Sequence, residues 1–149
     1  LAEQLDMPLS AMVDNSPQTT LRVLRYPPMP VSVPDGAVRA AAHGDINLLT
    51  LLVGATDSGL QVQDAEGLWH DVPTDENSIA VNIGDMLQMC TQGYYCSTIH
   101  RVINPEGASR DRARLSMPLF LHPKANVRLS KNYTAEEYRV ERLTAIGVM

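Results

Sequence analysis

The chain has 149 residues, a length that predicts one domain large enough for a hydrophobic core. Hydrophobic residues make up 44% of it and charged residues 19%, which is ordinary for a globular protein. A formal net charge of −5 argues against a nucleic-acid or anionic-membrane surface, and no apolar run approaches the roughly 18 residues of a membrane-spanning helix.

The first third of the chain begins with a helical pattern and continues with strand patterns. Leu1–Val13 is typical of the end of a helix broken near Pro8, and a polar connector follows. Leu21–Tyr26 alternates apolar and basic residues and is stopped by two prolines, which predicts a strand. Arg39–Gly54 carries a histidine and an aspartate into an apolar run, and we predict that it is extended.

Short strand patterns separated by Gly- and Pro-containing turns fill most of the remaining chain. Leu60–Gln63 and Leu68–Val72 predict a hairpin with a Gly-containing loop. Thr134, with a glutamate three residues on, forms a capping box and predicts a helix over Thr134–Leu143. The other predicted strands are Ile79–Ile83, Met86–Thr91, the run around His100, and Arg112–His122. Many short strands favour a sandwich or barrel over an α/β fold.

Two of these extended segments carry side chains that suit one metal site. His43 and Asp45 are two residues apart, and in a strand such side chains share a face. Both suit a divalent first-row metal, and His100 on a later strand would complete a 2-His-1-carboxylate triad. Arg114 and Ser116 then form a second pair able to share a face.

The order His-x-Asp, distal His and Arg-x-Ser resembles the iron(II)- and 2-oxoglutarate-dependent oxygenases, in particular their isopenicillin N synthase-like branch. Further matches are Leu49–Leu52 after the acid, Trp69, the VNIGDMLQ run, and the HRV that begins at His100. The resemblance implies a mainly β fold, a double-stranded β-helix. This is a cupin-like jelly roll, here with flanking N- and C-terminal helices.

The resemblance also implies cofactors and residue roles. The expected Fe(II) ligands are His43, Asp45 and His100, which would leave coordination positions for 2-oxoglutarate and dioxygen. Arg114 would hold the distal carboxylate of 2-oxoglutarate, with Ser116 as a further donor and Tyr26 nearby. Asn82, Gly84 and Asp85 match a family hallmark, but a turn explains Gly-Asp, and the three are left outside the predicted site.

We predict a single oxygenase core domain over 1–149. Residues 1–20 would be the end of a preceding helix and a connector, 21–129 the jelly-roll core, and 130–149 the C-terminal helix. The N-terminal region that precedes the core in the resembled family is expected to be absent. Cys90 and Cys96 match no zinc spacing and are interpreted as reduced thiols, which favours a cytoplasmic location.

The predicted activity is that of a non-haem Fe(II) oxygenase. It would couple oxidative decarboxylation of 2-oxoglutarate to hydroxylation or another oxidation of a small organic substrate. One alternative is an isopenicillin N synthase-like oxidase that does not use 2-oxoglutarate, since Arg-x-Ser can also grip a substrate's own carboxylate. Another is a cupin-like binding module without catalysis, against which the intact set of site residues argues.

Overall fold

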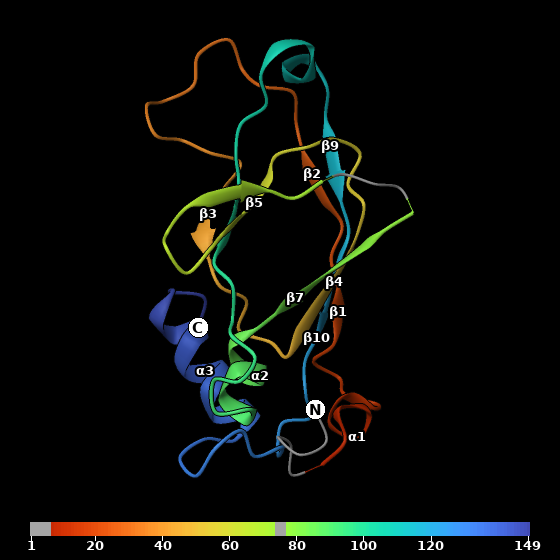
Figure 1. Ribbon diagram of the computed structural model, residues 1–149, viewed down its shortest axis with the longest axis vertical. Helices are drawn as coiled ribbons and strands as arrows, with labels where there is room; N and C mark the ends of the chain where they lie inside the picture. The colour runs from red at the N-terminus through yellow and green to blue at the C-terminus, as the bar shows by residue number, and fades with distance from the viewer. Residues whose placement is uncertain (1–6, 74–76) are drawn as a thin grey trace.

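The computed structural model describes residues 7–73 and 77–149, and this part of the chain is mainly β, as predicted (Figure 1). The strands are β1 (Thr20–Leu21), β2 (Leu24–Tyr26), β3 (Ala40–His43), β4 (Leu49–Val53), β5 (Leu60–Gln63), β6 (Trp69–Asp71), β7 (Ile79–Ile83), β8 (His100–Val102), β9 (Arg114–Ser116) and β10 (Pro118–Leu121). The helices are α1 (Leu9–Val13), α2 (Asp85–Cys90) and α3 (Ala135–Ala145), with a 3-10 helix at Gly107–Asp111. None of the helices in the described ranges is long and apolar enough to cross a membrane.

The strands form two four-stranded antiparallel sheets and a two-stranded ribbon. The first sheet has the order β1-β10-β4-β7, the second has the order β3-β8-β5-β6, and β2 pairs with β9. One cavity is lined by Thr50 and Phe120 of the first sheet and by Val62 and His100 of the second. The two sheets therefore face each other across this cavity, as in a jelly roll.

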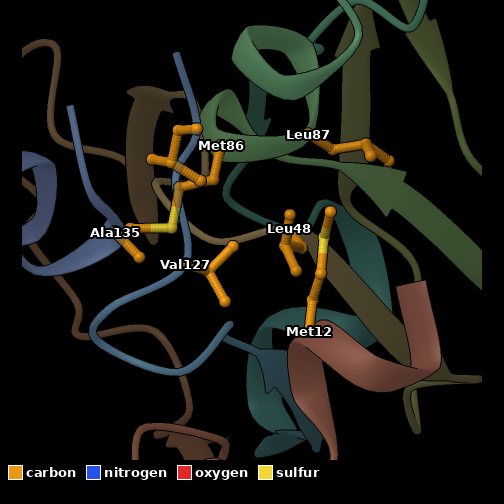
Figure 2. Packing of buried hydrophobic residues seen from close by; sticks show 7 residues of the cluster. Met12, Leu48, Met86, Leu87, Val127 and Ala135 are labelled. Carbon is orange, nitrogen blue, oxygen red and sulfur yellow. The ribbon is translucent and has the colours of Figure 1, made fainter. Parts of the chain in front are cut away.

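The helices α1, α2 and α3 gather at one end of the molecule (Figure 1), and residues from all three belong to one hydrophobic core cluster. Figure 2 shows Met12 of α1, Met86 of α2 and Ala135 of α3 around Leu48, which is completely buried. Burying each large apolar side chain contributes about 1.5–3 kcal/mol. Because Leu48 immediately precedes β4, this core fixes the start of that strand and the loop before it.

Several sequence predictions are confirmed to within one or two residues at their ends. The hairpin is formed by β5 and β6, with Gln61 opposite Asp71, and Ile79–Ile83 is strand β7. The helix α3 begins after Thr134, whose hydroxyl accepts from the backbone N–H of Glu137 while the Glu137 side chain accepts from the Thr134 backbone. Both halves of the predicted capping box are therefore present.

The prediction of a strand over Met86–Thr91 is wrong, because most of this segment is helix α2. Met86, Met89 and Cys90 are three and four residues apart, a spacing that places them on one helical face against the core. Met, Leu and Gln also have high helix propensity. In so short a segment the apolar run alone did not distinguish a helix from a strand.

Two predicted strands are each divided in two. Arg112–His122 contains β9 and β10, and Leu21–Tyr26 lies across β1 and β2. β9 pairs with β2, whereas β10 pairs with β1 and β4, so the partner changes at Met117. Pro118 follows directly and has no N–H to continue a ladder, which suits a change of sheet at this point.

Candidate active site

His43 is the last residue of β3, and Asp45 lies beyond the strand, in the bend that leads to β4. The prediction that one continuous strand carries both residues is therefore wrong. The chain bends here because it must cross from the second sheet to the first. The backbone N–H of Asp85 donates to the carbonyl oxygen of Asp45 at 2.8 Å and holds the bend in place.

β8 brings the distal histidine to the same place. It pairs with β3 so that His43 and His100 are directly opposite, with ring centroids 4.4 Å apart. One potential ligand atom from each of His43, Asp45 and His100 lies within 4.8 Å of the other two. The structure thus brings together the three residues predicted as metal ligands.

The two imidazoles are held in a state suited to metal binding. The Nδ1 atom of His43 lies 2.7 Å from the carbonyl oxygen of Ala41, and that of His100 lies 3.2 Å from the carbonyl oxygen of Thr98. Because a carbonyl oxygen only accepts, each Nδ1 is the donor in this contact, which leaves Nε2 as the atom of each ring that can bind a metal. Two imidazoles and one carboxylate are the donor set that fits Fe(II) with open coordination positions.

Two residues outside the predicted site contact the Asp45 carboxylate. The Thr50 hydroxyl donates to Asp45 Oδ2 at 2.6 Å, and the Asn82 amide donates to the same oxygen at 2.9 Å. Sequence reasoning noticed Asn82 in the VNIGDMLQ run but excluded it together with the turn that follows. Nothing in the sequence identified Thr50 as a site residue, because threonine is common in strands.

Arg114 is a buried cation in the wall of the same cavity, with only 2% of its surface exposed. Its Nε donates to the carbonyl oxygen of Asp57 at 2.9 Å, while Nη1 is buried without a hydrogen-bond partner among the described residues. Burial lowers the pKa of Arg114, and the neighbouring Tyr26 opposes this shift, yet an arginine keeps its charge at physiological pH. A buried guanidinium with an unpaired nitrogen fits a carboxylate.

Tyr26 and Ser116 lie beside this guanidinium. The register of β2 and β9 pairs Tyr26 with Arg114, and the Arg114 Cζ atom lies 5.5 Å from the Tyr26 ring centroid. Arg114 and Ser116 are both buried while Leu115 between them is exposed. They therefore share one face, as their spacing predicts.

All six predicted site residues line a single cavity of about 440 Å³ between the sheets. The rest of its wall is mainly apolar. Among these apolar residues are Leu24, Leu52, Leu60, Val62, Val72, Val102 and Phe120. A candidate metal centre and a candidate anion site thus open into one apolar space, which can hold a small organic molecule away from water.

The model of the 2OG-Fe(II) oxygenase superfamily matches residues 17–123. The chain belongs to this superfamily. A 2-oxoglutarate-dependent dioxygenase of Monascus ruber is 38% identical over 148 residues, which is 88% of this chain and 43% of the relative. A flavonol synthase/flavanone 3-hydroxylase of Petunia hybrida is 38% identical over 103 residues, covering 69% of this chain and 28% of that protein.

Solved structures agree with the family and with its fold. The crystal structure of a candidate oxygenase from Shewanella oneidensis has 52% identity and a TM-score of 0.88, over 99% of this chain and 55% of that one. A full-length Neurospora crassa protein solved with alpha-KG has 29% identity and a TM-score of 0.80, over 92% of this chain and 47% of that one. The predicted double-stranded β-helix is confirmed, and the chain spans about half the length of these relatives.

Proposed function

We propose that this chain is the core of an Fe(II)- and 2-oxoglutarate-dependent dioxygenase, with His43, Asp45 and His100 as the metal ligands. The observation that carries the proposal is one cavity that holds both this His-Asp-His cluster and a buried arginine with an unpaired nitrogen. Fe(II), when bound, supplies the chemistry that couples decarboxylation of 2-oxoglutarate by dioxygen to hydroxylation or another oxidation of a substrate.

In this proposal the β2–β9 ribbon binds the cosubstrate. Arg114 pairs with the distal carboxylate of 2-oxoglutarate, because its Nη1 lacks another acceptor among the described residues. Ser116, on the same face, contributes a hydroxyl donor. Tyr26 covers the guanidinium and keeps it oriented toward the cavity.

The substrate in this proposal is a small organic molecule, as the superfamily implies, with an apolar body that suits the walls of the cavity. The named relatives include a flavonol synthase/flavanone 3-hydroxylase and a bifunctional coumaroyl CoA and feruloyl CoA ortho-hydroxylase, and these names refer to different compounds. Together these relatives support oxidation of an organic molecule as the type of reaction, but they do not point to one substrate. The assignment to the isopenicillin N synthase-like branch stays a prediction.

The proposal treats residues 1–149 as one domain, with 21–129 as the jelly-roll core. Its support is the hydrophobic core in which Met12 of α1 and Ala135 of α3 pack into the same cluster. A cytoplasmic location remains part of the proposal. It rests on the interpretation of the cysteines as reduced thiols.

The test is an anaerobic titration of the chain with Fe(II) and then with 2-oxoglutarate. We expect one tight Fe(II) site, and then a weak visible charge-transfer band as 2-oxoglutarate chelates the metal. The matched control is Asp45→Ala, which should fold but lose most Fe(II) affinity. Tight Fe(II) binding with no response to 2-oxoglutarate would favour the oxidase alternative, and equal Fe(II) binding by Asp45→Ala would refute the ligand assignment.

A further inference from the structure

The two oxygens of the Asp45 carboxylate have different surroundings. Oδ2 accepts two hydrogen bonds, from the Thr50 hydroxyl at 2.6 Å and from the Asn82 amide at 2.9 Å. No hydrogen bond reaches Oδ1 within residues 7–73 and 77–149, and this oxygen lies 3.8 Å from Nε2 of His100. Oδ2 is therefore hydrogen-bonded to residues of the first sheet, whereas Oδ1 is free of hydrogen bonds from the described residues and lies near His100.

Sheet register puts both donors in place. Thr50 of β4 and Asn82 of β7 are directly opposite each other in the antiparallel ladder, and both line the cavity. Cross-strand neighbours of this kind have Cβ atoms about 4.5–5.5 Å apart, so one carboxylate oxygen can lie between their polar ends. The arrangement depends on two paired strands rather than on a loop.

A third residue fixes the direction of the Thr50 hydroxyl. The Asn47 amide donates to Thr50 Oγ1 at 3.0 Å and to the carbonyl oxygen of Leu49 at 2.9 Å. An ionised carboxylate only accepts, so the single proton of the Thr50 hydroxyl lies toward Asp45. Asn47 is 1% exposed and Thr50 is 5% exposed, so water competes little for these bonds.

We infer that Thr50 and Asn82 are positioning residues that make Asp45 bind its metal through Oδ1 alone. This inference rests on the proposed function, in which Asp45 is a metal ligand. If Oδ2 were unengaged, the carboxylate could rotate or bind through both oxygens, and a second oxygen would take up a coordination position. Holding Oδ2 keeps that position open and prepares the ligand before the metal arrives.

The hydrogen bonds have two opposing effects on the affinity for metal. They withdraw charge from the carboxylate, which weakens Oδ1 as a donor. They also remove the rotational freedom that the Asp45 side chain would otherwise lose when the metal binds. Residues that orient metal ligands commonly change metal affinity by about 10–100-fold when they are replaced, so we expect orientation to be the larger effect.

The experiment measures the affinity for Fe(II) alone by anaerobic calorimetry, together with the visible spectrum of the Co(II)-loaded protein. Thr50→Val keeps the shape of the side chain but removes its donor, and we expect a dissociation constant about 10–100-fold higher and a changed Co(II) spectrum. Thr50→Ser keeps the hydroxyl and should restore both readouts. Thr91→Val is the matched control, because Thr91 is a buried, hydrogen-bonded threonine that does not contact the metal ligands.

Two further results separate the inference from the proposed function. Thr50→Val with the affinity and spectrum of the wild type would overturn the inference while leaving the metal site intact. A wild-type chain that binds no Fe(II) would overturn both. If Thr50→Val does not fold, as judged by circular dichroism, Asn82→Leu tests the second donor with the same two readouts and the same expected direction.

Discussion

Arg114 places a full charge inside the protein, and few groups compensate for it. Its contacts among the described residues are one carbonyl oxygen, that of Asp57, and the face of the Tyr26 ring. The Asp57 carboxylate lies 3.9 Å from Nη2 of Arg112, and its charge is the smallest of the influences on the pKa of Arg114. An unpaired buried charge is costly, so this arginine is best explained by an anion that binds to it.

Replacing Arg114 by Ala should therefore weaken 2-oxoglutarate binding to the Fe(II)-loaded protein. Losing one partner of a buried, charge-assisted pair costs roughly 2–5 kcal/mol, so the dissociation constant should rise more than tenfold. Arg114→Lys should recover part of this loss, because it keeps the charge without the planar fork. Calorimetry provides the measurement.

The matched control for this prediction is Arg112→Ala. Arg112 is two residues away, but its side chain is 69% exposed, and it should have little effect on 2-oxoglutarate binding. If Arg112→Ala and Arg114→Ala weaken binding equally, the effect is general electrostatic attraction and not a carboxylate site.

Tyr138 of α3 connects the C-terminal helix to the start of α2. Its hydroxyl donates to Oδ2 of Asp85 at 2.9 Å. Burial raises the pKa of Tyr138 to about 12, and the Asp85 carboxylate adds to this shift. Because the folded pKa is above the unfolded value, the contribution to stability is complete below about pH 10 and is lost as the pH rises toward 12.

The prediction is that the wild type loses unfolding free energy across this alkaline range more steeply than Tyr138→Phe does. Urea unfolding at pH values from 8 to about 11.5 would measure it. The wild type has to be compared with Tyr138→Phe rather than judged by itself, because Tyr133 also has a raised pKa, caused by its hydrogen bond to Glu141. Tyr133 is present in both proteins, so its contribution cancels in the difference. Tyr94→Phe, which alters an exposed tyrosine, is the control. Parallel pH profiles for the wild type and Tyr138→Phe would contradict the prediction.

At the scale of elements, the loop over residues 44–48, here called the metal loop because it carries Asp45, forms one hydrogen-bonded unit with the start of α2. The backbone N–H groups of Gly84, Asp85 and Met86 donate to the carbonyl oxygens of Leu48, Asp45 and Asn47, at 2.9, 2.8 and 3.1 Å. The backbones approach so closely that a Cβ added to Gly84 would overlap the Asn47 carbonyl oxygen. The φ of Gly84 is −98°, so glycine is needed here for space and not for an unusual conformation.

Gly84→Ala should therefore push α2 away from the metal loop. We expect it to destabilise the fold by about 1–3 kcal/mol, as overpacking does, and to lower the Fe(II) affinity because Asp45 shifts. Gly93→Ala is the control, since Gly93 has a φ of +85° but open space around it. Gly93→Ala should destabilise the fold without changing metal affinity. If Gly84→Ala binds metal as tightly as the wild type does, the position of the metal loop does not depend on this contact.

How far the sequence predicts each element depends on how local its signal is. The β5–β6 hairpin, β7 and the capping box of α3 follow from neighbouring residues, and all were predicted. The bend at Asp45 and the split at Met117 depend on which sheet the chain must join next, and a single strand pattern does not carry that information. Thr50 and Asn82 lie opposite each other because of the register between β4 and β7. The spacing of residues along the sequence does not reveal that register.

At the scale of the whole molecule, the outer faces of the two sheets differ in chemistry. On the second sheet Gln61 receives a hydrogen bond from Arg101 and donates one to Asp71, which makes a polar row across three strands. On the first sheet the register aligns four apolar residues across all four strands: Leu21, Leu119, Leu51 and Val81. Leu21 and Val81, at the two ends of this row, are exposed, and exposed apolar side chains of this kind are typical of a surface that contacts other protein.

The last prediction concerns this apolar face when the chain is studied by itself. Ile79 and Val81 are 59% and 60% exposed, at the edge strand β7. We expect the chain to self-associate as its concentration rises, and the double change Ile79→Thr and Val81→Thr to reduce that association. Threonine keeps the β-branched shape that suits a strand, so the fold and the Fe(II) affinity should not change.

Sedimentation velocity over a range of concentrations, with the metal titration repeated on each variant, would measure both parts of this prediction. The control is Val31→Thr, since Val31 is equally apolar and fully exposed but lies in the loop between β2 and β3, away from the sheet. If the control reduces association as much as the double variant does, the effect is general hydrophobicity. If neither does, the outer face of the first sheet is not what holds the copies together.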